Sequence, residues 1–115
     1  MNTTRKYKIE VRLWIEETEG PFLGIGKIWL LENIRKTGSI TNAAKEMKMA
    51  YRQAWQLVKE MNQRAESPLV EKNLGGKGGG GARLTPAGEK AIATFYEIEK
   101  RIQDFAEKET QNLKF

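Results

Sequence analysis

Residues 39–63, SITNAAKEMKMAYRQAWQLVKEMNQ, contain two short apolar repeats separated by a break. In the first repeat, the spacing of Ile40, Ala43, Ala44 and Met47 places one apolar stripe along a helix, and the hydroxyl of Ser39 can cap its start. The two alanines are small enough to let another helix approach closely. A first short helix is therefore expected over about residues 40–48.

The second repeat predicts a helix over about residues 50–65, with two opposed faces. Its inner face carries apolar side chains: Ala54, Leu57, Val58, Met61 and Ala65. Its outer face carries polar and cationic side chains: Arg52, Gln53, Gln56, Lys59 and Gln63. Arg and Gln can form bidentate hydrogen bonds with guanine and adenine in the major groove. The two helices together predict a helix-turn-helix whose second helix reads duplex DNA.

The residues before this unit predict one strand and one helix. Residues 8–17 alternate between apolar and polar side chains, which is typical of a half-buried strand. A helix is expected over about residues 24–37, with Gly38 as its stop. Its apolar positions are Ile25, Ile28, Trp29, Leu31 and Ile34.

The residues after the unit predict a hairpin and a long helix. Residues 69–74 and 82–84 read as two strands joined by a glycine-rich tip, so residues 69–85 form a wing. Thr85 and Pro86 signal the start of a helix that runs to about residue 108. The expected fold is mainly α with a small antiparallel sheet (α+β): a single winged helix-turn-helix domain over residues 1–115.

The wing glycines also satisfy the pattern of a dinucleotide-binding loop, Gly76-Lys77-Gly78-Gly79-Gly80-Gly81. That loop needs a helix directly after it, whereas residues 82–84 read as strand. A wing tip close to a DNA backbone is therefore favoured, with Lys77 and Arg83 supplying charge. A surface hairpin without a DNA contact is the alternative.

Composition excludes several classes of function. Residues 39–90 carry nine Lys and Arg against five Glu, an excess of four in a chain whose net charge is +5, which favours a nucleic-acid partner. The chain has no Cys and no His, so zinc sites and Cys or His catalysis are excluded. No enzyme activity, metal or cofactor is expected. No signal peptide or membrane span is visible, so a cytoplasmic protein is expected.

Tyr51, Arg52, Gln53 and Gln56 occupy the first turns of the second helix, where such helices reach base edges. An ordinary polar helix face is the alternative. Lys59 is expected to meet phosphates or only solvent. Trp55 lies near the apolar stripe, so packing is favoured over stacking on a base. Trp14 lies on the polar side of its strand, which suggests contact with another element or subunit.

The final helix repeats apolar residues at coiled-coil spacing: Ala91, Phe95, Ile98, Ile102 and Phe105. Two such helices could pair, so these residues are expected at the interface of a homodimer. The alternative is a single helix packed on its own domain.

The AYRQAW and EMN motifs of residues 50–62 and the wing string GGKGGGGARLT resemble the DNA-binding domain of the molybdate-responsive transcriptional regulator (ModE) family. The S-I-T-x-A-A opening at Ser39 is more distantly similar to LysR-type regulators. The resemblance implies a winged helix-turn-helix dimer that binds an operator. It adds the start of the first helix to the candidate DNA-binding residues, which are then Thr41, Asn42, Tyr51, Arg52, Gln53, Gln56, Lys59, Lys77 and Arg83.

The sequence departs from this family in three places. The chain ends at Phe115 without the oxyanion-binding domains of the molybdate sensors, so molybdate binding is not expected within it. Ala50 replaces a Ser that often begins the reading helix, and Lys48 stands where a turn glycine is common. The function expected is a sequence-specific DNA-binding transcriptional regulator of the molybdate-regulator type that lacks the molybdate-sensing domain. The alternative is a winged-helix protein-interaction module.

Overall fold

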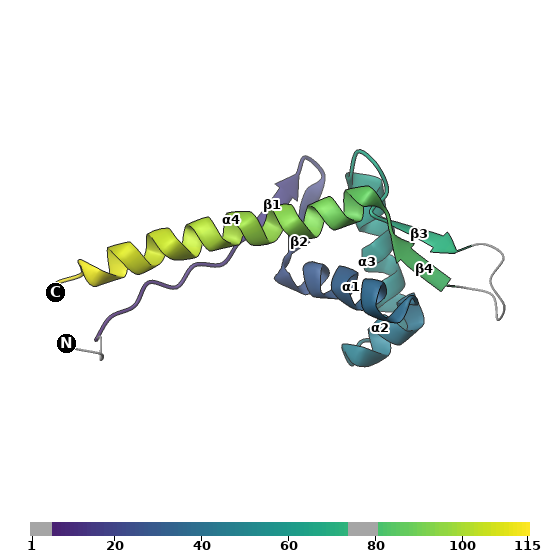
Figure 1. Ribbon diagram of the computed structural model, residues 1–115, viewed down its shortest axis with the longest axis horizontal. Helices are drawn as coiled ribbons and strands as arrows, with labels where there is room; N and C mark the ends of the chain where they lie inside the picture. Colours follow the sequence, from purple (N-terminus) through teal and green to yellow (C-terminus); the bar gives the residue numbers. More distant parts are fainter. Residues whose placement is uncertain (1–5, 74–80) are drawn as a thin grey trace.

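The computed structural model describes residues 6–73 and 81–115 (Figure 1). Within these residues, four helices and two antiparallel strand pairs follow one another. In order they are β1 (Trp14–Glu17), β2 (Gly20–Gly24), α1 (Ile25–Thr37), α2 (Ile40–Glu46), α3 (Tyr51–Arg64), β3 (Val70–Asn73), β4 (Gly81–Leu84) and α4 (Pro86–Gln111). The expected α+β winged helix-turn-helix is confirmed.

Helices α2 and α3 form the helix-turn-helix. The hydroxyl of Ser39 caps α2 by accepting a hydrogen bond from the backbone N–H of Asn42 at 3.1 Å. Ala43, Ala44 and Ala54 are almost fully buried. Their small side chains allow α2 and α3 to approach closely. Between the helices, Lys48 adopts a left-handed backbone conformation with φ of 53°, which is unfavourable for a residue with a Cβ.

The core gathers around α1, which contacts α2, α4, β2 and β4. Ile28, Leu31 and Ile34 are fully buried. Leu30 is fully buried as well, because α1 is covered from several directions. Trp29, one of the apolar positions of the expected helix, does not join this core. Its side chain is 51% exposed and lies on the side of α1 that this chain leaves uncovered.

The expected strand over residues 8–17 is much shorter in the structure. Only Trp14–Glu17 pair with a neighbour, the unexpected strand β2, and the register shifts between Ile15 and Glu16. β2 is too short to pair with more of the segment. Arg64 at the end of α3 contacts this hairpin, because it donates to the carbonyl of Pro21 and lies 3.9 Å from Glu17.

The wing strands lead directly into α4. The backbone N–H of Thr85 donates to the carbonyl of Leu69 at 3.0 Å, and the hydroxyl of Thr85 caps α4 by accepting from Gly88 N–H at 3.0 Å. A Cβ on Gly88 would lie 2.2 Å from the Leu69 carbonyl oxygen, so only glycine allows this approach. Leu74, expected at the end of the first wing strand, lies outside the described residues.

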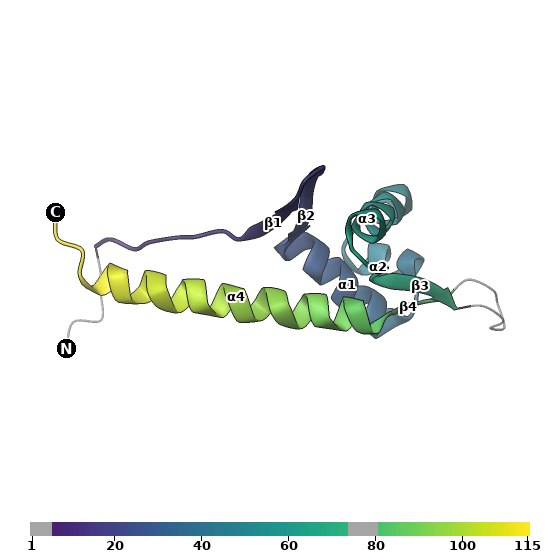
Figure 2. The ribbon, with the colours of Figure 1, turned by 90° about the horizontal axis from the view of Figure 1, so that it is seen from above.

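Helix α4 projects far beyond the globular part (Figures 1 and 2). The Cα radius of gyration is 17.7 Å and the longest dimension is 60 Å, whereas a compact chain of this length has a radius of about 13 Å. The extended segment 6–13 runs beside the far half of α4 (Figure 2). The N–H of Ile9 donates to the Thr110 hydroxyl at 3.0 Å, and the rings of Tyr7 and Phe115 meet edge to face.

We expect Lys48→Gly to stabilise the protein, because glycine adopts the left-handed conformation without a Cβ penalty of about 1–2 kcal/mol. The greater freedom of glycine in the unfolded chain offsets about 0.5–1 kcal/mol of this gain. The free energy of unfolding in urea should rise by about 0.5–1 kcal/mol. Lys45→Gly, inside α2, is the matched control and should lower the same quantity by about 1 kcal/mol.

We expect Ala50→Ser to stabilise α3. Ala50 is the N-cap residue, with an extended backbone and no side-chain hydrogen bond to the helix. A serine hydroxyl there can accept from a free N–H of the first turn, which is worth about 0.5–1 kcal/mol. Thermal unfolding monitored by circular dichroism measures the change. Ala50→Val, which supplies no acceptor, should give no gain, and an equal gain from Val would contradict the capping explanation.

Candidate nucleic-acid interface

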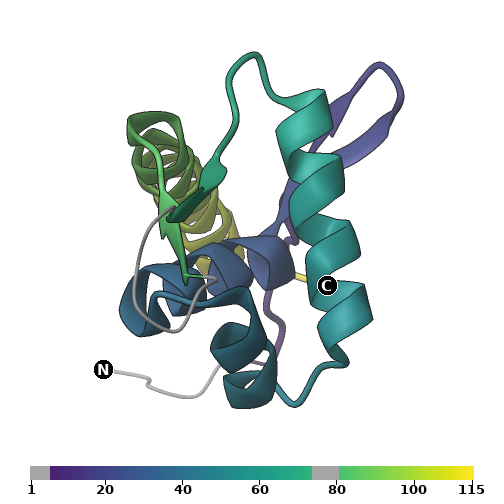
Figure 3. The same ribbon diagram turned by 90° about the vertical axis from the view of Figure 1, so that its right-hand side faces the viewer.

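Helix α3 presents one exposed line of polar side chains. Arg52, Gln56, Lys59 and Gln63 are all exposed, and their spacing of about one helical turn places them on one face. The opposite face carries the buried stripe of Ala54, Val58 and Met61. In Figure 3, α3 and the wing strands stand side by side toward the viewer, and α4 extends away behind them. Among the described residues, the four side chains of this line are open to solvent.

Other expected reading residues lie on the edges of this line. Tyr51, the first residue of α3, is 50% exposed, and Gln53 is also exposed. The side-chain amide of Gln56 donates to a carboxylate oxygen of Glu60 at 3.1 Å. Because the amide nitrogen of Gln56 makes this bond, its amide oxygen can still accept a hydrogen bond from another donor.

The start of α2 lies next to the start of α3. Thr41 and Asn42 are both exposed. Thr41 lines a small hollow together with Tyr51 of α3 and Gly81 of β4. The structure thus brings together residues from the helix-turn-helix and the wing strands, although they are far apart in the sequence.

Of the two expected wing cations, Arg83 lies within the described residues. Arg83 is exposed on β4, and its Nε lies 2.8 Å from Oε1 of Glu71 directly across the strand pair. Such a pair stabilises the hairpin modestly and offsets the charge of Arg83. Lys77 lies outside the described residues.

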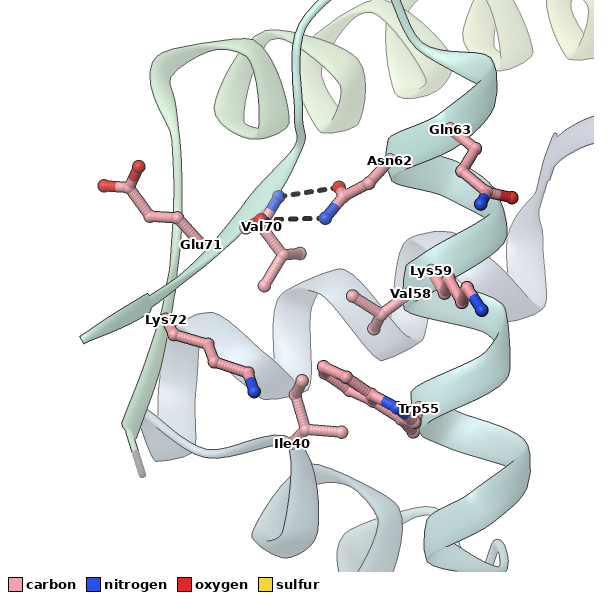
Figure 4. Close-up of a pocket in the computed structure, with 9 residues that line it drawn as sticks. All are labelled: Ile40, Trp55, Val58, Lys59, Asn62, Gln63, Val70, Glu71 and Lys72. Atoms are coloured by element: carbon pink, nitrogen blue, oxygen red, sulfur yellow. Dashed lines mark hydrogen bonds between the residues drawn. The ribbon is translucent and has the colours of Figure 1, made fainter. Parts of the chain in front are cut away.

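A groove of about 400 Å³ separates α3 from β3 (Figure 4). Its floor is apolar and is formed by Ile40, Trp55, Val58 and Val70. The expectation that Trp55 packs is confirmed, since it is partly buried against the core. The indole also borders the open groove. Trp55 therefore packs against the core and can still contact a ligand in the groove.

Asn62 bridges α3 and β3 at one end of this groove and was not among the expected site residues. Its side-chain oxygen accepts from the N–H groups of Leu69 and Val70 at 2.8 and 3.1 Å. Its side-chain nitrogen donates to the Val70 carbonyl at 2.9 Å (Figure 4). The amide thus replaces a strand neighbour and sets the position of the wing. Two signals pointed to it: a polar residue next to the inner stripe of α3, and its place in the EMN motif.

Lys72 closes the groove near its other end and was also missed as a candidate. Its Nζ lies 4.7 Å from the centroid of the Trp55 ring. Lys72 follows Val70 by two positions, so both side chains lie on the side of β3 that faces α3 (Figure 4). This strand alternation was the available signal.

The expected dimer residues of α4 divide into three groups. Phe95 is fully buried in the monomer core, which corrects its assignment to an interface. Ala91, Ile98 and Ile102 are partly exposed. Phe105 is 66% exposed. The seam spacing serves the monomer core near the start of α4 and leaves apolar surface on the projecting part.

Tyr96 joins α4 to α1 on the same helix. Its hydroxyl donates to Oε1 of Glu32 at 2.9 Å. Burial, followed by the hydrogen bond to Glu32, raises the pKa of Tyr96 above its usual value.

Neither a metal-binding cluster nor a membrane-crossing helix is found among the described residues. In residues 6–73 and 81–115, no group of His, Cys, Asp and Glu side chains could hold a metal ion. In the same residues, no helix combines the length and the apolar character needed to cross a membrane.

Known proteins match this chain over most of its length. It is 47% identical over 83 residues to the molybdenum-pterin-binding protein MopB of Rhodobacter capsulatus, covering 72% of this chain and 31% of that protein. It is 40% identical over 97 residues to the DNA-binding transcriptional dual regulator ModE of Escherichia coli K12, covering 84% and 37%. The figures for the transcriptional regulator ModE of Haemophilus influenzae are 37% over 97 residues, covering 84% and 38%.

These matches confirm the resemblance to ModE-type regulators. The chain spans just over a third of the length of the two ModE proteins and just under a third of MopB. The family model for bacterial regulatory helix-turn-helix proteins of the lysR family matches residues 26–89, which contain α1 apart from its first residue, α2, α3 and the wing strands. That match covers more than half of the sequence, so the chain belongs to the lysR family of bacterial regulatory helix-turn-helix proteins.

Proposed function

We propose that this chain binds duplex DNA sequence-specifically, as the DNA-reading part of a transcriptional regulator of the molybdate-regulator type. The exposed line of Arg52, Gln56, Lys59 and Gln63 on α3 carries the proposal. A helix can enter the major groove only if one face is free while the other is held by the protein. Two relatives that are transcriptional regulators, one of them named as DNA-binding, support the same function.

In this proposal, the residues on α3 have different roles. Arg52 and Gln56 read base edges, because their side chains can form paired hydrogen bonds with guanine and adenine. Tyr51 and Gln53 flank them, and Lys59 contacts a phosphate. Thr41 and Asn42 approach the backbone from α2. Arg83 contributes less to affinity, because Glu71 already pairs with it.

Arg52→Ala is expected to weaken binding to the preferred site by about 1–3 kcal/mol and to weaken binding to random duplex much less. Sites are first selected from a random DNA pool with the unchanged protein, and affinities are then measured by fluorescence anisotropy. Arg101→Ala is the matched control, because Arg101 is exposed on α4 far from α3 and pairs only locally with Glu97. Equal losses on selected and random DNA would show that Arg52 contacts only phosphates.

The proposal includes a homodimer joined through the projecting part of α4 and the segment beside it. This region exposes Val11 (37%), Trp14 (58%) and Phe105 (66%). The partly buried Ile98 and Ile102 continue the apolar surface along α4. A symmetric pair covers this surface and presents two copies of α3 to the two half-sites of an operator.

Phe105→Glu is expected to convert a dimer into a monomer, since the interface would then bury an unpaired carboxylate. Sedimentation equilibrium at micromolar concentration measures the mass. Ala93→Glu makes the same kind of change at an exposed position of α4 away from Phe105, and it should remain dimeric. A monomeric unchanged protein, or a dimeric Phe105→Glu variant, would contradict this interface.

A further inference from the structure

The groove between α3 and β3 is positioned on one flank of the reading helix. Lys59 and Gln63 reach it from α3, and Lys72 reaches it from β3 (Figure 4). Near Lys72, the hollow lined by Thr41 and Tyr51 adds two hydroxyl groups. The groove thus has an apolar floor and a rim of cations and hydrogen-bond donors.

Charge complementarity favours an anionic occupant. Lys59 and Lys72 are the two cations of the lining. Its one carboxylate, Glu71, is already paired with Arg83. Lys72 and Glu71 are neighbours on a strand, so their side chains leave opposite faces. The cation of Lys72 therefore faces α3, whereas the Glu71–Arg83 pair lies on the other side of the wing.

Trp55 holds the ammonium group of Lys72 in place. The 4.7 Å distance between Nζ and the ring centroid is within the range of a cation–π interaction. A free lysine side chain loses considerable rotamer entropy when it binds. A lysine that already rests on an indole loses less, and the ammonium keeps N–H groups directed away from the ring for another acceptor.

A helix in the major groove has a phosphate strand along each flank. Because β3 lies on one flank of α3, the groove between them faces one of these strands. We propose that Lys72, held by Trp55, is a prearranged contact for a backbone phosphate of duplex DNA on the wing side of α3. This assignment rests on the proposed DNA binding and adds the Trp55–Lys72 pair to its site.

The pair has a specific division of roles. Lys72 touches the phosphate, and Trp55 acts as a positioning residue through Lys72. Trp55 therefore contributes to affinity only when Lys72 is present. A tryptophan that merely fills the core would contribute equally with or without Lys72, so coupling between the two residues distinguishes the two roles.

The test is a double-mutant cycle on the whole chain, with Lys72→Gln, Trp55→Leu, Trp55→Phe and the double variant Lys72→Gln/Trp55→Leu. Affinity for the selected duplex is measured from 50 to 200 mM salt. Lys72→Gln should reduce the slope of log affinity against log salt by about one. Trp55→Leu should weaken binding several-fold in the unchanged protein and have little effect beside Lys72→Gln. Trp55→Phe, which keeps an aromatic face, should retain most of the affinity.

Lys108→Gln is the matched charge control, because Lys108 is exposed near the far end of α4. Its slope should equal that of the unchanged protein, and a reduction as large as that of Lys72→Gln would overturn the contact. An unchanged slope for Lys72→Gln, or equal effects of Trp55→Leu with and without Lys72, would also overturn it. If Trp55→Leu does not fold, the Lys72→Gln slope and the Trp55→Phe affinity decide.

The failure of this contact is distinguishable from the failure of DNA binding. If Arg52→Ala relaxes specificity while Lys72→Gln leaves the salt slope unchanged, only the Lys72 contact is overturned. If the unchanged protein binds no duplex at any salt concentration, both proposals are overturned.

Discussion

The site depends on how firmly the inner face of α3 is held. Ala54, Val58 and Met61 are almost fully buried, and Ala43 and Ala44 of α2 pack into the same core. Because the stripe is continuous from the second turn of α3 to its last, rotation of the helix would expose apolar surface along its whole length. The orientation of every outward side chain on α3 is therefore fixed by residues that are almost fully buried. Packing, rather than the polar residues themselves, determines which amides and guanidinium groups face outward.

Much of this architecture was predictable because it depends on local patterns. The apolar periodicity of residues 40–47 and 54–61, the Ser39 and Thr85 caps and the stop at Gly38 act within a few residues of the positions that they control. The ends of α1, α2 and α3 therefore lie close to the expected ones. The exposed reading line was predictable for the same reason, because the outer face of a helix follows from its inner face.

The remaining features depend on partners that are distant in the sequence. Residues 8–17 alternate like a strand, but pairing ends where β2 ends, and segment 6–13 runs along α4 instead. The spacing of Phe95 with Phe105 resembles one seam, although Phe95 lies inside the core and Phe105 lies beyond it. Neither the place of Asn62 in the EMN motif nor that of Lys72 in its strand reveals what these side chains contact. Their roles appear only when β3 lies beside α3, which no periodicity of either element reveals.

The absence of a linker between the wing and α4 has a mechanical consequence. Thr85 ends the wing and caps the helix, so β4 and a 26-residue helix behave as one stiff lever. Such a helix is about 39 Å long. If α4 tilts by about 5° about its far end, the helix-turn-helix at its other end moves by about 3 Å. This is close to the rise of one base step along a strand of DNA. In the proposed dimer, small changes in the angle between the two α4 helices would thus alter how well the two copies of α3 match the spacing between half-sites.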